Sequence, residues 1–223
     1  MTDDQARQFN EAFAAWEKRH NTRAFRLIRR VINNVPDSID KVGMMFWEVM
    51  WELDLHNVSK ARSRFDQMKT IFRSIGYWPP DSGDSAKASV AAMALFAEAR
   101  VLIDENHLVG AERILRDLES RYSEQISSAS FDGIGEQVPI LHGITLANLG
   151  RWSEARPFLE TAAIPQGWEG HVGYYLGAME YLEGNWAQAK ERLTKAIHFG
   201  VPKRWKPEAD RMLRESERKI AKG

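Results

Sequence analysis

The chain contains no cysteine, which excludes disulfide bonds, thiolate metal sites and a cysteine nucleophile. It has no net charge, because 31 basic residues balance 31 acidic ones, so its charge favours neither nucleic acid nor an anionic membrane as a partner. No apolar run approaches the roughly 20 residues of a membrane-spanning helix, so we expect no membrane contact. The N-terminal stretch is acidic and polar where a signal peptide would be basic and then apolar. These absences predict a cytoplasmic protein.

Strict alternation of apolar and polar residues, the pattern of a half-buried strand, is almost missing too. Apolar residues instead recur three and four positions apart, as in "FNEAFAAW" and "RAFRLIRRVI". With 43% hydrophobic and 28% charged residues, the chain has the balance of a soluble globular protein. We therefore predict an all-α fold of eleven helices. Two contain the stretches just quoted, and the others lie near 38–55, 58–75, 86–105, 108–123, 137–149, 152–163, 169–183, 186–199 and 206–221.

Short connections join most of these helices, which favours antiparallel neighbours. Two longer segments, "GYWPPDSGDSAK" at 76–87 and "SEQISSASFDGIGEQ" at 123–137, are rich in Gly, Ser or Pro, and we predict loops there. Helix pairs resume on both sides of each loop, so neither is expected to be a domain linker. The sequence predicts a single domain over residues 1–223.

Two stretches near the C-terminus repeat the same residues 34 positions apart. "LGRWSEARPFLETAA" (149–163) and "EGNWAQAKERLTKAI" (183–197) share a Gly, a Trp, a Leu and two Ala at equal spacing. Two helices packed as a hairpin need small residues where their backbones come closest, so we expect Gly177 and Ala189 to form such a pair. Gly184 would end the first helix in a left-handed conformation. Each hairpin leaves an apolar face that only another hairpin covers, so the units must stack.

In these residues the sequence resembles the tetratricopeptide repeat (TPR), a 34-residue helix–turn–helix family. The repeats over 137–168 and 169–202 match best, with Gly143, Gly150, Ala155, Leu159 and Ala162 in the first and Leu176, Gly177, Gly184, Ala189, Leu193, Ala196 and Pro202 in the second. Weaker copies with other spacings have second helices marked by Ala24, Ile28, Val31 and Pro36, by Ala61, Phe65 and Met68, and by Ala111, Leu115 and Leu118. The resemblance implies a right-handed helical-hairpin solenoid of about five TPR-like repeats. A C-terminal capping helix over 205–221 would close it, with Trp205, Met212 and Leu213 facing inward.

The resemblance also implies a function, that of a non-enzymatic adaptor or scaffold whose first helices line a concave groove for a protein segment. By aligned position, the inward, peptide-binding residues would be Met93, Phe96, Arg100, Ile140, Ile144, His171, Tyr174 and Tyr181. Phe46 and Met50, or else Trp47 and Trp51, would extend the groove, depending on helix register. Because these side chains are mostly apolar or aromatic, we expect the ligand to be an amphipathic helix or apolar segment. A register error of one residue would make them interhelix core instead.

Motifs of catalysis are missing: the chain has no GxSxG, no Walker loop and no Gly-rich dinucleotide fingerprint. Glu48, Glu52 and His56 are each four apart, so on one helical face they could bind a metal or share a proton. No second helix supplies the further acid and His ligands that a bundle metal site needs. We therefore predict a solvent-exposed face here, with His56 near a helix C-terminus. We expect no enzyme activity, no metal and no cofactor.

Two basic stretches leave nucleic-acid binding as the alternative function. Residues 18–35 contain six Lys or Arg and no acid, and residues 203–222 carry eight basic and four acidic side chains. Arg23, Arg26 and Arg30 share one helix face, which could follow phosphates. Since we expect that face on the outer side of the solenoid, a protein or peptide partner is the first hypothesis. A regulatory helical-repeat protein that contacts nucleic acid is the second, and the oligomeric state stays open, homo-oligomers included.

Overall fold

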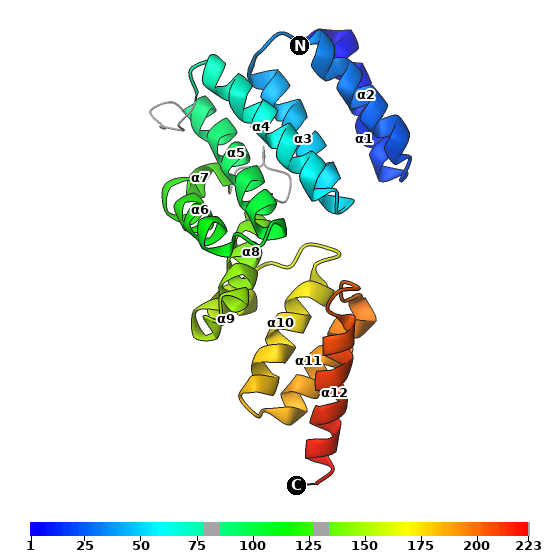
Figure 1. Ribbon diagram of the computed structural model, residues 1–223, viewed down its shortest axis with the longest axis vertical. Helices are drawn as coiled ribbons and strands as arrows, with labels where there is room; N and C mark the ends of the chain where they lie inside the picture. Colours follow the sequence, from blue (N-terminus) through cyan, green and yellow to red (C-terminus); the bar gives the residue numbers. More distant parts are fainter. Residues whose placement is uncertain (78–84, 127–133, 223) are drawn as a thin grey trace. The chain divides into compact units, whose positions relative to one another are not determined.

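The computed structural model describes residues 1–77, 85–126 and 134–222, in which it contains twelve helices and no strand. All eleven predicted helices are present, so the all-α prediction is confirmed. In chain order they are α1 (Asp3–Glu17), α2 (Asn21–Asn34), α3 (Ile39–Asp54), α4 (Val58–Ser74), α5 (Ser85–Asp104), α6 (Leu108–Arg121), α7 (Ser123–Ile126), α8 (Ile134–Asn148), α9 (Trp152–Thr161), α10 (Glu169–Leu182), α11 (Trp186–Phe199) and α12 (Lys206–Ile220) (Figure 1).

The twelfth helix, α7, lies inside the segment that the sequence predicts as a loop. It occupies 123–126, and α8 already begins at Ile134, so the predicted loop over 123–137 is wrong at both of its ends. Likewise α5 begins at Ser85, inside the predicted loop 76–87. The remaining parts of these two loop predictions, 78–84 and 127–133, lie outside the described residues.

Contacts between residues divide the chain into two compact units, Met1–Ile114 (unit 1) and Leu115–Gly223 (unit 2), with the boundary inside α6. In unit 1, α1 packs on α2 and α3 on α4, and α5 packs against α3 and α4 (Figure 1). In unit 2, α8 packs on α9 and α10 on α11, and α12 packs against α10 and α11. Consecutive helices therefore pack in pairs, as the short connections predict. The single domain over 1–223 stays a prediction.

Several helix starts follow from local side-chain chemistry. Thr2 accepts a hydrogen bond from the backbone of Gln5, whose side chain accepts one from the backbone of Thr2, so a capping box begins α1. The hydroxyl of Ser38 accepts the N–H of Lys41 at the start of α3. These caps pair backbone N–H groups that have no partner inside the helix.

One type of turn joins the two helices of each of five hairpins: α1–α2, α3–α4, α5–α6, α8–α9 and α10–α11. A residue with positive φ is followed by a residue whose N–H donates to the carbonyl five positions earlier, at 2.8–3.0 Å. The left-handed conformation predicted for Gly184 is confirmed, with φ of 79°. The five turn pairs are Arg19–His20, His56–Asn57, Asn106–His107, Gly150–Arg151 and Gly184–Asn185.

These turns fix the register of the second helices, because an alanine follows each turn at the same distance and is fully buried. The five alanines are Ala24, Ala61, Ala111, Ala155 and Ala189. A large apolar residue four positions later is also buried in each hairpin, namely Ile28, Phe65, Leu115, Leu159 and Leu193. This alanine and this large residue are thus buried in all five hairpins, whereas Ala162, the second repeating alanine of its hairpin, is half-exposed.

The close approach of helices α10 and α11 involves a different pair from the one predicted. A Cβ atom added to Gly177 would lie 2.7 Å from Cγ of Leu193, and its nearest neighbours all belong to Leu193 rather than Ala189. The same relationship recurs in the preceding hairpin, where a Cβ on Gly143 would lie 2.7 Å from Cγ of Leu159. Each glycine therefore leaves room for a leucine of the second helix.

The C-terminal helix α12 covers the last hairpin of unit 2. Met212 is buried in a cluster with Leu193 of α11, and Leu213 packs against the same cluster. Trp205, directly before α12, packs against a neighbouring core that contains Tyr175. The predicted inward orientation of these three residues of the final segment is confirmed.

Candidate functional site

Half-exposed aromatic side chains from α1 and α3 lie in contact in unit 1. The ring of Phe13 lies 4.9 Å from that of Phe9 and 5.0 Å from that of Trp47, both edge-to-face. We call Phe9, Phe13 and Trp47 the aromatic row; its members come from the first helices of two successive hairpins. A Cβ added to Gly43, one turn before Trp47, would have no atom within 4 Å, so the surface beside that end of the row is open.

Buried rings hold the aromatic row from beneath. Trp51 is buried, lies 5.2 Å from Phe13 and stacks on Trp16 with ring centroids 4.9 Å apart. Phe46 is buried and lies 5.2 Å from Trp47. Edge-to-face and stacked contacts of this kind fix ring orientation beyond simple apolar burial. The row is therefore a firmly supported, partly solvent-exposed aromatic surface.

Of the four α3 residues that the sequence offers for the groove, only Trp47 is half-exposed. Phe46, Met50 and Trp51 are buried. The sequence offered two alternative pairs, Phe46 with Met50 or Trp47 with Trp51. Neither pair is exposed as a whole, because only Trp47 reaches solvent.

The predicted groove residues on α5 are divided in the same way. Phe96 is buried, with its ring 6.4 Å from that of Phe46. Met93 and Arg100 are half-exposed, and Nη2 of Arg100 lies 3.5 Å from Oδ1 of Asp54. Phe96 therefore contributes to the interior of unit 1 in this structure, whereas Met93 and Arg100 reach solvent.

In unit 2, Ile140 and Ile144 are buried in the core that α8 shares with α9 and α10. His171, Tyr174 and Tyr181 are half-exposed on α10. All three contact the C-terminal segment rather than forming an open surface.

The ring of Tyr174 stacks on Trp205 at 5.4 Å, and His171 meets the same indole edge-to-face at 5.6 Å. The hydroxyl of Tyr181 donates to Oε2 of Glu215 at 2.6 Å. Burial raises the pKa of Tyr174, and the hydrogen bond to Glu215 raises that of Tyr181. The final segment of the chain thus occupies much of this face of α10. Peptide binding by the eight predicted groove residues stays a prediction.

The predicted acid–histidine face on α3 does not form. The helix ends at Asp54, so His56 lies beyond it, exposed and with φ of 59°, in the turn to α4. Glu48 and Glu52 are buried, which shows that the prediction of a solvent-exposed face is wrong for both carboxylates.

Arginines from neighbouring helices explain why these two carboxylates are buried. Nε of Arg29, on α2, lies 2.5 Å from Oε1 of Glu48, and its Nη2 lies 3.0 Å from Oε1 of Glu52. Nε of Arg64, on α4, lies 2.9 Å from Glu48, and the amide of Asn57 donates to Oε2 of Glu52 at 2.8 Å. A buried carboxylate is costly unless it is paired, and here the pairing joins α2, α3 and α4.

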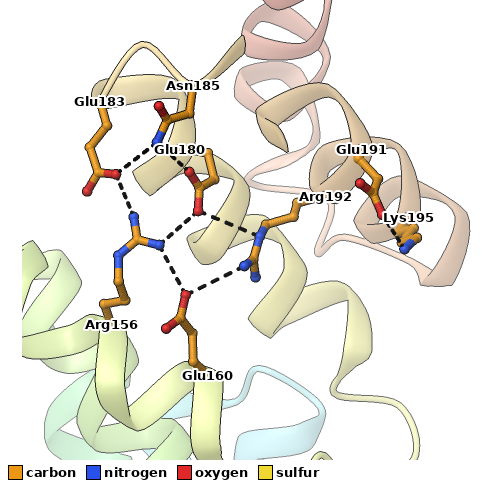
Figure 2. Close-up of polar contacts among 8 residues, drawn as sticks. All are labelled: Arg156, Glu160, Glu180, Glu183, Asn185, Glu191, Arg192 and Lys195. Carbon is orange, nitrogen blue, oxygen red and sulfur yellow. Dashed lines mark hydrogen bonds and ion pairs between the residues drawn. The ribbon is translucent and has the colours of Figure 1, made fainter. Parts of the chain in front are cut away.

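Unit 2 contains a second cluster of the same construction around the buried Glu180 of α10 (Figure 2). Nη1 of Arg156, on α9, lies 2.8 Å from Oε1 of Glu180 and 3.1 Å from Glu160. Nε of Arg192, on α11, lies 3.8 Å from Oε1 of Glu180, and the amide of Asn185 donates to Oε2 at 2.8 Å. Each cluster therefore links a first helix to its own second helix and to the second helix of the hairpin before it.

A pattern of polar residues in the sequence marks these two clusters, although the spacing of apolar residues does not. Four positions recur at identical spacing in the two hairpins: Glu52, Asn57, Ala61 and Arg64 in one, and Glu180, Asn185, Ala189 and Arg192 in the other. Glu-x₄-Asn places the amide at the turn within reach of the carboxylate, which lies two residues before the end of the first helix. The bridging arginines Arg29 and Arg156 have no such fixed position relative to the motif.

The hydrogen bonds from Arg156 and Asn185 keep the buried carboxylate of Glu180 charged. Burial acts to raise its pKa, but the hydrogen bonds from Arg156 and Asn185 outweigh burial, and the pKa lies below its ordinary value. The hydrogen bond with Glu180 in turn raises the pKa of Arg156. The cluster is thus a stable ion-pair network, suited to holding helices together rather than to proton transfer near neutral pH.

The two basic stretches differ in how their cations are engaged. Arg23, Arg26 and Arg30 are exposed on α2 and have no ion pair within the part of the chain that the structure describes. In the stretch 203–222, by contrast, Arg211 pairs with two glutamates of its own helix, and the guanidinium of Arg204 lies 4.6 Å above the ring of Trp205.

Among residues 1–77, 85–126 and 134–222, no group of three or more His, Asp or Glu side chains could hold a metal ion. No helix of the same residues has both the length and the apolar character of a membrane span. Comparisons of the chain with family models, curated proteins and solved structures found no match. The functional argument therefore rests on the chain's own residues.

Proposed function

We propose that this chain is a non-enzymatic, TPR-like helical-repeat protein that acts in the cytoplasm as an adaptor, holding a segment of a partner protein. Five hairpins with one type of turn and equivalent buried alanines support a repeat origin. Stacking of such hairpins into one right-handed solenoid is part of the proposal. The acid–histidine face, the sequence's candidate for catalysis, does not assemble, which supports the non-enzymatic part.

The observation that carries the binding proposal is the aromatic row of Phe9, Phe13 and Trp47. Large rings that are half-exposed, rigidly supported and carried by first helices suit the apolar face of an amphipathic helix. The row therefore replaces the buried Phe96, Ile140 and Ile144 as the proposed apolar contact. Arg100 at the end of α5, although paired with Asp54, remains a proposed polar contact.

The proposal can be tested once affinity capture and mass spectrometry have supplied a partner in purified form. We expect Phe9→Ala combined with Trp47→Ala to weaken its binding at least about 30-fold in calorimetric titration, because anchoring rings carry a large share of interface energy. Phe199→Ala, which removes an exposed aromatic ring outside the row, is the matched control and should change the affinity by less than about twofold.

Salt separates this proposal from the nucleic-acid alternative. Burial of hydrocarbon contributes roughly 25 cal/mol per Å² and depends little on salt. Neutralising six or more phosphates would cost about 10³-fold in affinity between about 50 and 200 mM salt. We expect the affinity for the protein partner to change by less than about tenfold over that range of salt. Full binding by the Phe9 and Trp47 double variant, or a steep loss with salt, would contradict the proposal.

A further inference from the structure

The outward face of α2 carries an unusual concentration of unpaired positive charge. Arg23, Arg26 and Arg30 are exposed and lie on the side of the helix opposite its buried residues Ala24 and Ile28. Arg30 lies seven positions after Arg23, so the three arginines span about 10 Å along the helix axis. We call these three arginines the α2 cation face.

Two further cations extend the charge beyond the helix start. Lys18 and Arg19 are exposed in the turn before α2, and neither has an ion pair among the described residues. The next acids along the chain are Glu17 and Asp37, and Asp37 is engaged with Nζ of Lys41 at 3.1 Å. Residues 18–35 contain no acid, so no carboxylate within this stretch neutralises the face.

The hairpin fold does not require these arginines. The five equivalent turns fix the matching outward positions in the other second helices. In α9 those positions hold Glu154, Pro157 and Thr161, all exposed, and each of α4, α6 and α11 has one cation among the three. Since the fold accepts an acid, a proline or a hydroxyl there, three arginines in α2 have no structural explanation.

The arginine that α2 does need for packing points elsewhere. Arg29 turns to the buried carboxylates of Glu48 and Glu52, and its guanidinium lies 5.0 Å from the ring of Phe25. The helix thus separates a structural arginine from three solvent-facing ones. Like charges three and four positions apart destabilise a helix, and Arg23 adds positive charge to the positive end of the helix dipole. A bound anion would relieve both effects.

We propose that the α2 cation face binds an acidic segment of a partner protein. Charge complementarity argues for an anion, and three features favour carboxylates over nucleic acid. Phe25, the aromatic residue of α2, is half-exposed but is held edge-to-face by Trp16 and Trp51 and lies beneath the guanidinium of Arg29, so it offers bases no free ring face on which to stack. The chain as a whole has no net charge, so long-range attraction to a polyphosphate is lacking. Three arginines on one helix also match a short carboxylate series better than a long phosphate track.

This surface is separate from the aromatic row, so the inference goes beyond the proposed function and can fail without it. The probe is a short fluorescein-labelled poly-L-glutamate, and binding is followed by fluorescence anisotropy with the full chain. The test variant combines Arg23→Gln, Arg26→Gln and Arg30→Gln. The matched control combines Lys60→Gln, Arg73→Gln and Arg113→Gln, which removes the same charge from exposed cations of unit 1 that also lack ion pairs among the described residues.

We expect the test variant to bind poly-L-glutamate at least tenfold more weakly than the wild type at about 50 mM salt, and the control less than about twofold more weakly. The Phe9→Ala, Trp47→Ala variant should bind it as the wild type does. No binding by the wild type, or equal losses in the test and control variants, would overturn the inference. Tighter binding of a DNA oligonucleotide of equal charge through the same arginines would replace it with the nucleic-acid alternative.

Discussion

Asn185 donates its side-chain amide to the carboxylate of Glu180, five residues before it, at 2.8 Å. The same bond joins Asn57 and Glu52 in unit 1, at the same length and the same separation. In each case the donor begins a second helix and the acceptor lies near the end of the first, so the bond closes the hairpin from the inside. An arginine of the previous hairpin then reaches the same carboxylate. The polar core of these hairpins thus repeats along with their apolar core.

Removal of Arg156 should destabilise unit 2 because it deprives the buried carboxylate of Glu180 of its nearest cation. We expect Arg156→Ala to lower the free energy of unfolding by about 2–3 kcal/mol, since Arg192 and Asn185 still compensate part of the charge. Lys195→Ala is the control, because both Lys195 and its partner Glu191 are exposed and the loss of such a surface pair should change the free energy of unfolding much less. Urea unfolding followed by circular dichroism measures both. Equal effects of the two substitutions would contradict the structural role of the cluster.

The helices and their small-residue register could be predicted from sequence because both depend on local spacing. The turn at Gly184 and the buried Ala155 and Ala189 follow from a period that hydrophobic burial imposes on every hairpin. Even the divergent first hairpins have Ala24 and Ala61 at the expected place. These positions can be predicted without knowing which helix packs against them.

The candidate site could be predicted less well because it depends on contacts between helices. Glu48 and Glu52 look like a solvated stripe until Arg29, from another helix, is placed beside them. The inward or outward orientation of Phe46 and Trp47 changes with a rotation of one residue, and spacing within α3 does not fix that rotation. Neighbouring helices fix it through ring contacts such as that between Phe13 and Trp47.

Two helical glycines should respond in opposite directions to the same substitution. Gly177→Ala places a Cβ 2.7 Å from Cγ of Leu193 and should cost about 1–3 kcal/mol through overpacking. Gly43→Ala meets no atom within 4 Å and should stabilise α3 by about 0.5–1 kcal/mol, because alanine loses less backbone entropy on folding. Melting temperatures of the two variants measure the difference. A melting temperature of Gly177→Ala equal to that of the wild type would contradict the close contact between Gly177 of α10 and Leu193 of α11.

At the turns between helices, glycine should stabilise the fold, because the residue there has positive φ. His56 has φ of 59°, a conformation that costs a residue with a Cβ about 1–2 kcal/mol. His56→Gly should therefore raise the free energy of unfolding by about 1 kcal/mol. Gly150→Ala, at φ of 76°, should lower it by a similar amount, about 1 kcal/mol, although a Cβ there would meet no atom within 4 Å. Chemical denaturation of both variants tests the left-handed conformation in these two turns, and a loss of stability in His56→Gly would contradict it.

The stability of unit 2 should fall in acid through Glu180. Its pKa in the folded state lies below the ordinary value of 4.5, so its ion pairs stabilise the fold fully above pH 4.5. This contribution is lost as the pH falls through the folded-state pKa, because the unfolded chain then binds more protons. We expect Glu180→Gln to be less stable than the wild type near neutral pH and to approach the stability of the wild type as the pH falls below 4.5 and through the folded-state pKa. Glu217→Gln, which removes an exposed carboxylate 3.4 Å from Nζ of Lys190, is the control and should leave the pH profile nearly unchanged. Urea unfolding across this range measures the profiles, and a constant difference between wild type and Glu180→Gln down to the lowest pH would show that the carboxylate's charge does not stabilise the fold.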